Sequence, residues 1–436
     1  MKKSLFFFAA AALALTACSN DEDVNTSSVQ NNAQAVAFDT YTSGTTRAGM
    51  TGVMTTATLQ KALGDGGGFG VFAYQTSDTY PAGGTGKKPN FMYNEPVSYV
   101  SSVWSYGVLK YWPNNTTQDE LGGAGHAETT TPNDYVSFFA YAPYVSAGVD
   151  EPGITAMSAN SATGDPTVSY KVATDPAQSV DLLWAVTPTA WTYTDVANNN
   201  WNSTGDKDGL PLTNLLKPDV QTRVKFLFLH ALARLGVNVV AAVDQEAAGG
   251  ELDSQTKIVI TSVTITDATT VATTPAPNLA PSGTLNLNNT TANTALWTPD
   301  AISSPFTATI STTGIESSLL YESDAATSWA KEGVLTAKEK PLIAGGNYYM
   351  LIPPTTGSTD LSVNIVYHVI TKDTKLDGGY SDVVNNITRK VSIDFDNGKA
   401  YTLKLILGLT SVKLDAEVKT WEVQGATNVD LPKNQE

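Results

Sequence analysis

The residues most able to do chemistry in this sequence are few and far apart. Of the three histidines, His126 lies in the loop-like stretch GGAGHAETT, whereas His230 and His368 lie inside apolar runs. Zinc sites usually need histidines at close spacing, as in HExxH or HxH, and the sequence has neither motif. We therefore predict that His230 and His368 are hydrogen-bonded residues of the core or of strands, and we expect no metal site.

Two further segments carry part of a binding motif. The stretch GDGGGFG, residues 64–70, lacks the Lys-Ser/Thr pair of a phosphate-binding loop, so we interpret it as a lead-in to a strand. The stretch DFDNG, residues 394–398, has alternating acids that could bind calcium but lacks the remaining ligands of a calcium loop, and Asp-Asn-Gly between strand-like runs favours a hairpin turn. A hydrolase would need two acids brought together by the fold. We predict no catalytic residue, no cofactor and no enzyme activity.

The first residues predict an export signal. Lys2 and Lys3 precede an apolar run from Leu5 to Leu15, which is shorter than the roughly 20 residues needed to span a bilayer. We interpret residues 1–17 as a cleaved signal peptide and expect no transmembrane helix in the mature chain.

Cys18 is the single cysteine, so an intramolecular disulfide and a thiolate zinc site are excluded. Leu15 to Cys18 (LTAC) resembles the bacterial lipobox, in which the thiol receives a lipid and the chain is cut before it. Buried acyl chains contribute about 0.8 kcal/mol per methylene, enough together to anchor a protein to the outer membrane. An ordinary signal peptide with an incidental cysteine is the alternative. The tract from Ser19 to Asp23 (SNDED) resembles an acidic surface-export tract, or it forms a solvated linker.

Composition narrows the possible partners. The formal net charge is −16, and loss of Lys2 and Lys3 with the signal would make it more negative, so nucleic acid is a poor partner. Charged residues make up 16% of the chain, against about 25% in ordinary globular proteins. Solubility must come largely from Thr, Ser, Asn and Gly, which suit sheets and turns.

The elements that would position any site are predicted to be strands. Short apolar runs rich in β-branched and aromatic residues recur between turn-rich stretches. They lie at residues 68–74, 135–145, 180–186, 257–267, 347–354, 361–370, 390–395 and 400–409. Weak helix candidates are residues 54–63 and 228–235, the second of which fits either period. We predict an all-β chain of sandwiches.

The length of 436 residues predicts at least two domains. The polar tract 198–218 is the best boundary candidate. Aromatic residues leave one alternative function open: Trp104, Trp112 and Trp184 lie in or beside apolar runs and are expected in the core, whereas Trp191 and Trp201 lie in polar surroundings and could stack on sugars. The alternative is a surface glycan-binding lipoprotein of the outer membrane.

Several later segments carry a family resemblance. They are VDLLWA (180–185), VKFLFLHALARLGVNV (224–239), GTLNL (283–287), PLIAGGNYYMLIPP (341–354) and FDNGKAYTLKLILGLTSVKLDAEVKTWE (395–422). Together they look like the fimbrillin-like lipoproteins of Bacteroides and relatives, which are subunits of type V pili. The resemblance implies two transthyretin-like β-sandwich domains in tandem, a location at the cell surface in a fimbrium, a role in adhesion or biofilm, and partnership with other pilin subunits.

The same resemblance gives Arg47 a role. It implies cleavage between Arg47 and Ala48 by an extracellular Arg-specific protease, after a first strand at residues 34–42 (QAVAFDTYT), which alternates as a strand should. An ordinary loop arginine is the alternative. We thus divide the chain into a leader with a removable strand (18–47), an N-terminal sandwich (48–215) and a C-terminal sandwich (216–436).

Polymerisation would then use donor strand exchange. Removal of the first strand would leave an unpaired sheet edge, which a strand from a neighbouring subunit could fill. The donor candidate lies at residues 410–423, where Val412, Leu414, Ala416, Val418 and Trp421 could occupy successive pockets, although the same alternation suits an ordinary final strand. The cleavage loop and the carboxyl-terminal extension favour a stalk subunit over an anchor or a tip.

Overall fold

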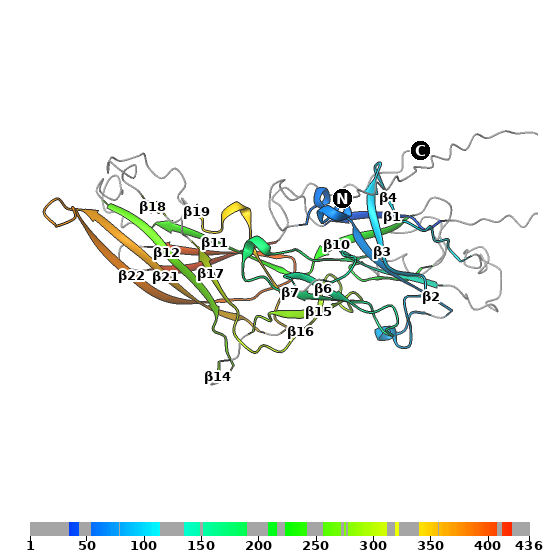
Figure 1. Ribbon diagram of the computed structural model, residues 1–436. Helices are drawn as coiled ribbons and strands as arrows, with labels where there is room; N and C mark the ends of the chain where they lie inside the picture. Colours follow the sequence, from blue (N-terminus) through cyan, green and yellow to red (C-terminus); the bar gives the residue numbers. More distant parts are fainter. Residues whose placement is uncertain are drawn as a thin grey trace, which may run out of the picture. The chain divides into compact units, whose positions relative to one another are not determined.

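The structure is a computed structural model, and its strands confirm the all-β prediction (Figure 1). Residues 34–436 form one compact unit. The structure describes residues 35–42, 54–77, 79–113, 135–148, 151–189, 208–215, 223–241, 256–271, 274–275, 278–311, 319–321, 340–355, 357–407 and 412–420.

The first sheet contains the strand predicted at residues 34–42. Its order is β1-β10-β8-β5-β2-β3-β4, with β9 paired to β5. The strands are β1 (Phe38–Thr42), β10 (Val224–His230), β8 (Leu183–Val186), β5 (Tyr135–Ala142), β2 (Phe69–Thr76), β3 (Met92–Val100), β4 (Val103–Ser105) and β9 (Leu212–Leu215). β2 is buried along almost its whole length because both faces of this sheet are covered.

A second, four-stranded sheet has the order β16-β15-β7-β6. Its strands are β16 (Leu296–Pro299), β15 (Ser282–Asn286), β7 (Thr167–Lys171) and β6 (Gly153–Met157). Val168, Tyr170 and Leu285 of this sheet share a core cluster with Phe139 and Trp184 of the first sheet.

Two five-stranded sheets are built from the later part of the chain. The third sheet orders β19 (Lys340–Pro341), β11 (Ala233–Ala241), β23 (Lys399–Leu407) and β24 (Val412–Thr420), with β20 (Tyr349–Leu351) beside β11. The fourth orders β17 (Thr307–Ser311), β12 (Thr256–Asp267), β21 (Thr359–Lys372) and β22 (Tyr380–Ile393), with β18 (Leu319–Tyr321) beside β12. β13 (Thr270–Val271) and β14 (Thr274–Pro275) form a separate ladder.

Helical structure is slight in the described residues. The candidate at 54–63 is confirmed only as one short helix, α1 (Thr56–Leu59), which Thr55 caps by accepting the amide of Thr58. Single 3-10 turns are η1 (Leu63–Asp65), η2 (Ala82–Gly84), η3 (Pro176–Gln178) and η6 (Ala344–Gly346). None of the described helices is long and apolar enough to cross a membrane.

The helical alternative for residues 228–235 is wrong. β10 and β11 divide this stretch, and alternate residues of β10 are buried, which is the period of a strand. The hairpin at residues 394–398 is also wrong. Gly398 does supply a turn at φ 66°, but the strands on either side, β22 and β23, belong to different sheets. That turn therefore carries the chain from the fourth sheet to the third.

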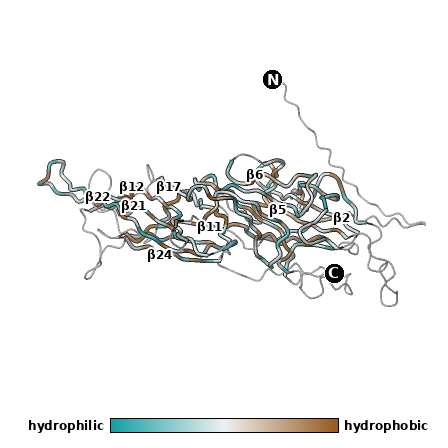
Figure 2. The backbone as a smooth tube through the Cα atoms, turned by 90° about the horizontal axis from the view of Figure 1, so that it is seen from below, coloured by the Kyte–Doolittle hydropathy of each residue, from teal (hydrophilic) through white to brown (hydrophobic). Residues whose placement is uncertain are grey.

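Strand pairing does not follow the predicted boundary between residues 215 and 216. β10 pairs with β1 and β8, and β15 pairs with β7, so strands from beyond residue 216 complete both of the first two sheets. One buried cluster joins residues of all four larger sheets. In Figure 2 hydrophobic colour runs along strands such as β5 and β11, whereas the end of the β21–β22 hairpin is hydrophilic. The division into two tandem domains stays a prediction.

Candidate assembly site

β1 is an edge strand held by one partner. It lies parallel to β10, with Phe38 opposite Val224 and Thr42 opposite Phe228, and no other strand of the described chain continues the sheet beyond it. A parallel pair needs a long crossover connection, and here about 180 residues of chain separate the two strands. The strand predicted at 34–42 is therefore confirmed over Phe38–Thr42, and its partner comes from far along the sequence.

Phe38 fixes β1 to the core. Its side chain is fully buried, and its ring stacks on that of Phe226 with centroids 5.6 Å apart. Its edge or face also meets the rings of Phe69, Tyr106 and Phe138 at 5.7 to 6.1 Å. Burial of one phenylalanine contributes about 1.5–3 kcal/mol, and aromatic pairs add to it. Without β1, these four rings would line an apolar groove.

The chain just before β1 is anchored as well. Val36 is buried, its amide donates to the carbonyl of Lys110 at 2.8 Å, and its carbonyl accepts the hydroxyl of Tyr106 at 2.8 Å. The carbonyl of Ala37 accepts the amide of Val224 at 2.8 Å. Residues 36 and 38 thus point inward at the period of two that any replacement strand would have to reproduce.

Asp39 lies on the opposite face of β1 from Phe38. It faces Arg223 at 3.7 Å, with both side chains partly exposed. Burial raises the pKa of the Asp39 carboxyl, and the positive charges of Arg223 and Lys225 only partly oppose that rise. Folding therefore makes ionisation of this carboxyl less favourable than it is in the unfolded chain.

Thr42 and Met54, the described residues on either side of Arg47, both lie near the end of β10. The described chain stops at Thr42, which pairs with Phe228, and resumes at Met54. The amide of Met54 donates to Asp181 Oδ2 at 2.9 Å, and the same oxygen lies 2.8 Å from Nδ1 of His230, the last residue of β10. Residues 43–53, including Arg47 and Ala48, lie outside the described residues.

The donor candidate is an edge strand of its own sheet. β24 pairs with β23 in antiparallel register from Leu407 opposite Val412 to Lys399 opposite Thr420. Leu414 and Ala416 are half-buried against the core, whereas Val418 is 55% exposed.

Polar contacts on β24 involve Glu417. Its carboxylate lies 3.0 Å from Lys404 on β23 and 2.7 Å from Lys419. Hydrogen bonds first from Lys419 and then from Lys404 lower the pKa of Glu417. The strand is thus held mainly by its backbone ladder and by two partly buried apolar side chains.

The remaining predicted site residues fall outside the described chain. Cys18 and Trp421 are among them, and nothing is described of the side chain of Val412. The structure therefore describes the strand predicted to be removable and the donor candidate, and it tests neither lipidation nor cleavage.

The other chemically able residues have ordinary structural partners. His230 is buried against Asp181, and His368 on β21 lies 2.8 Å from Asp382 on β22, so both are hydrogen-bonded strand residues as predicted. Trp104, Trp112 and Trp184 are buried as expected. No cluster of three metal-binding side chains occurs in the described part of the chain. His126, Trp191 and Trp201 lie outside it.

Asp181 and Met54 are not among the residues that the sequence alone singles out. Asp181 stands in the apolar run VDLLWAV, where an isolated acid is a signal of a buried partner. Its partner His230 was seen only as a hydrogen-bonded core or strand residue, because the pairing depends on β8 and β10 lying side by side.

The fold, with its all-β sheets and buried first strand, is similar to the crystal structure of a fimbrial protein from Bacteroides vulgatus ATCC 8482. The TM-score is 0.55 at 21% identity, over 89% of this chain and 99% of that one. In sequence, the chain is similar to the fimbrium subunit Fim1C of Phocaeicola vulgatus, with 26% identity over 442 residues and 97% of each chain covered. No family model matches. These relatives confirm the resemblance to Bacteroides fimbrillins.

Proposed function

We propose that this chain is a structural subunit of a cell-surface fimbrium. The observation that carries the proposal is similarity along 97% of the chain to a protein named as a fimbrium subunit. The buried edge strand β1 supports it, because a subunit that joins others through strands needs a sheet edge that can be opened. The role is structural, and no catalytic step is assigned to the chain.

Assembly in this proposal begins with proteolysis after Arg47. Cutting between Arg47 and Ala48 separates β1 from the chain that resumes at Met54, so β1 is then held only by its own contacts. Met54 remains attached through Asp181. Loss of β1 exposes the unpaired edge of β10 and the ring-lined groove around Phe226.

A neighbouring subunit then fills the groove with its carboxyl-terminal strand. The vacated positions of Val36 and Phe38 require inward side chains at a period of two. Val412, Leu414, Ala416 and Val418 offer that period, and Trp421 extends it less regularly. Before cleavage β1 blocks the groove, so the precursor stays monomeric. This sequence of events is that of a stalk subunit of a type V pilus.

Delivery to the surface rests on the amino terminus. A lipid on Cys18 would hold the precursor in the outer membrane until cleavage removes residues 18–47 together with the anchor. The partners in this scheme are an Arg-specific extracellular protease, other pilin subunits and the outer membrane. A fimbrium of this kind would serve adhesion or biofilm formation. The alternative of a glycan-binding lipoprotein has its named residues, Trp191 and Trp201, outside the described chain and is not proposed.

The test compares three proteins recovered from the surface of producing cells: wild type, Arg47→Ala and Arg47→Lys. The lysine variant is the matched control, because it keeps the positive charge but removes the arginine that the protease requires. Amino-terminal sequencing, intact mass and denaturing gels without heating are the measurements. We expect a start at Ala48 and heat-labile ladders in the wild type only.

Two results would contradict the proposal. A lipidated start at Cys18 in wild-type surface material, without ladders, would remove cleavage and polymerisation. Ladders of equal intensity in all three proteins would show that assembly does not depend on a cut after Arg47.

A further inference from the structure

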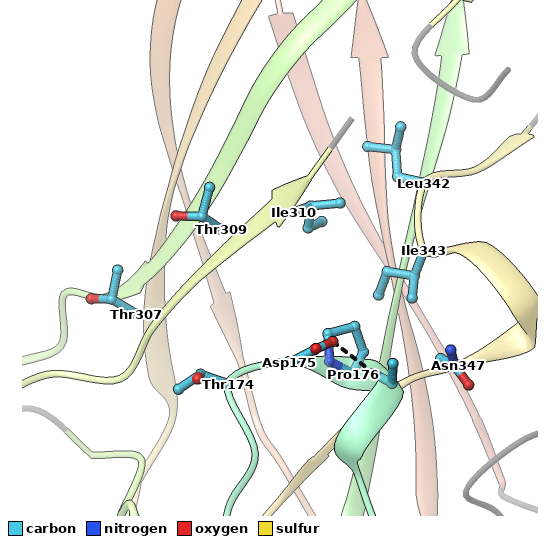
Figure 3. A pocket seen from close by; sticks show the side chains of 10 residues that line it. Thr174, Asp175, Pro176, Thr307, Thr309, Ile310, Leu342, Ile343 and Asn347 are labelled. Carbon is cyan, nitrogen blue, oxygen red and sulfur yellow. Dashed lines mark hydrogen bonds between the residues drawn. The ribbon is translucent and has the colours of Figure 1, made fainter. Parts of the chain in front are cut away.

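A cavity and a groove in the described chain could each receive an apolar side chain. The cavity, of about 460 Å³, lies between η3, β17 and the connection from β19 to β20 (Figure 3). Its floor is formed by Ile310, Leu342 and Ile343, while Asp175 at its rim is exposed and accepts the amide of Ala177 at 2.9 Å. These groups select no single ligand. The groove beneath β1 is different, because β1 itself shows which side chains fit there.

The groove takes side chains of graded size along β1. Val36 and Phe38 are buried in it, and Thr40, which shares their face of the strand, is partly buried. Phe38 occupies the largest space, since four rings surround its own at centroid distances of 5.6 to 6.1 Å. We call this space the Phe38 site. The inward residues of β1 thus run from medium to large to small.

The outward face of β1 adds a charge at one position. Asp39 is opposite Lys225 in the register with β10, and its carboxylate lies 3.7 Å from Arg223. Both cations attract the carboxylate, although burial opposes its charge. A basic residue at this position would instead meet two like charges. The charges therefore discriminate between incoming residues more than they add affinity.

β24 carries the same order of side chains as β1. The segment VKLDA (412–416) matches VAFDT (36–40): the valine and the acid are identical, and the inward residues again run from medium to large to small. Leu414 is half-buried against the core of its own subunit and Asp415 is exposed. The two strands, which lie far apart in the sequence, therefore also present the large apolar residue and the acid on opposite faces in the same way.

Other placements of β24 in the groove fail on size or on charge. A shift of two residues in one direction puts Ala416 in the Phe38 site, where its methyl group leaves most of the space unfilled. A shift in the other direction puts Lys413 beside Arg223, where like charges repel. Reversing the strand with Leu414 kept in the Phe38 site also brings Lys413 to that position.

Trp421 is a larger apolar candidate for the Phe38 site. Placed there, it would turn Lys419 inward two residues away, whichever way the strand ran. An ammonium on the apolar face of the groove is costly, so this placement is disfavoured.

We propose that β24 of a second copy replaces β1 in one register, parallel to β10, with Leu414 in the Phe38 site and Asp415 beside Arg223. This inference rests on the proposed function and adds which residues of the two subunits meet. The backbone gives the same frame to both strands. Lys110 and Tyr106 bind the N–H and C=O of Val36, and Val412, which is not a proline, offers both groups at that position.

Paired cysteines test the register in assembled ladders. Opposite residues on neighbouring strands have Cα atoms about 4.8 Å apart, which suits a disulfide, whereas a shift of two residues separates them by about 8 Å. Asp415→Cys combined with Lys225→Cys should therefore form a disulfide between subunits on mild oxidation, because Lys225 is opposite the position of Asp39. A subunit that starts at Ala48 lacks the single cysteine of the chain, so no other thiol competes.

Two matched controls report the alternative placements. Lys413→Cys with Lys225→Cys would crosslink in the reversed strand and in one shifted register, and Glu417→Cys with Lys225→Cys would crosslink in the other. We expect neither pair to crosslink.

A larger residue at position 414 separates a role in the groove from packing within the subunit. Leu414→Phe reproduces the ring of Phe38 and should raise the temperature at which ladders dissociate, whereas Ala416→Phe should not. If Leu414 served only its own subunit, Leu414→Phe would change the melting temperature of the uncleaved precursor without strengthening the ladders.

The outcomes distinguish the register from assembly itself. Crosslinking in either control pair, ladders without crosslinking of Asp415→Cys to Lys225→Cys, or ladders strengthened by Ala416→Phe and not by Leu414→Phe would each overturn the register and leave assembly standing. Absence of ladders from the parent protein without added cysteines would overturn the assembly proposal and the register with it.

Discussion

Phe38→Ala should release β1 locally without unfolding the protein. The substitution removes a fully buried ring that contacts the rings of Phe69, Phe138 and Phe226. Phenylalanine-to-alanine changes in cores cost about 3–5 kcal/mol. Because β1 is bound to one neighbouring strand only, we expect that cost to fall on the equilibrium between bound and detached β1.

Hydrogen exchange measures this equilibrium directly. A cost of about 3 kcal/mol raises the detached population roughly 100-fold, and the amides of β10 that β1 protects should exchange faster by that factor. Amides of β12 and β21, in the fourth sheet, should keep their rates. Phe306→Ala is the matched control, because Phe306 is a buried phenylalanine that packs on Tyr349 and belongs to a different core cluster from Phe38.

Two outcomes would refute this reasoning. Unchanged exchange in β10 would mean that Phe38 does not hold β1 in place. Equal acceleration in all sheets would mean that β1 is part of the global folding unit, and its removal by a protease would then unfold the subunit.

Three further predictions concern charged groups. Asp39→Asn should raise the melting temperature relative to wild type, and by more as the pH rises from 3.5 to 7. Burial raises the pKa of Asp39, so the wild type loses stability when the carboxyl ionises, whereas the amide of the variant does not titrate. A difference in melting temperature that stays constant with pH would contradict this prediction. His230→Ala should lower the free energy of unfolding in urea by about 3–5 kcal/mol, because Asp181 keeps its burial but loses its 2.8 Å partner; a loss below about 1 kcal/mol would show that the pair is unimportant. Glu417→Gln should speed amide exchange in β24 at neutral pH but not at acidic pH. Because the pKa of Glu417 is lowered in the folded protein, its stabilisation of β24 is present above the ordinary pKa of a glutamate and is lost as the pH falls through the folded pKa. Equal exchange rates in the variant and the wild type at neutral pH would contradict this prediction.

The strands were predictable where their burial pattern is local. Residues 135–145, 257–267 and 400–409 correspond to β5, β12 and β23, since each has the composition or alternation that a strand leaves in the sequence. β22 was predicted only at its end, because most of its residues are exposed and its sequence has no continuous apolar face. β10 and β11 were ambiguous because two short apolar strands in succession also match a helical period.

The candidate site was predictable in part for the same reason. The strand before Arg47 alternates visibly, so β1 could be expected, but its partner β10 could not, because parallel pairing over so long a crossover leaves no local signal. The Asp181–His230 pair and the cavity beside Asp175 arise from segments far apart in the sequence. The domain boundary near residue 215 stays a prediction, because composition marks loops but carries no signal that β10 and β15 return to complete earlier sheets.

The arrangement of the two core clusters explains how a subunit could lose β1 and remain folded. Val36 and Phe38 belong to the smaller cluster on one face of the first sheet. The larger cluster, which joins all four larger sheets, contains no residue of the segment 35–42. β10 also keeps its antiparallel pairing with β8, from Leu227 opposite Val186 to His230 opposite Leu183. Departure of β1 would therefore open one groove and leave the remaining sheets paired, and a groove of buried rings in an otherwise stable subunit is what an incoming apolar strand can bind.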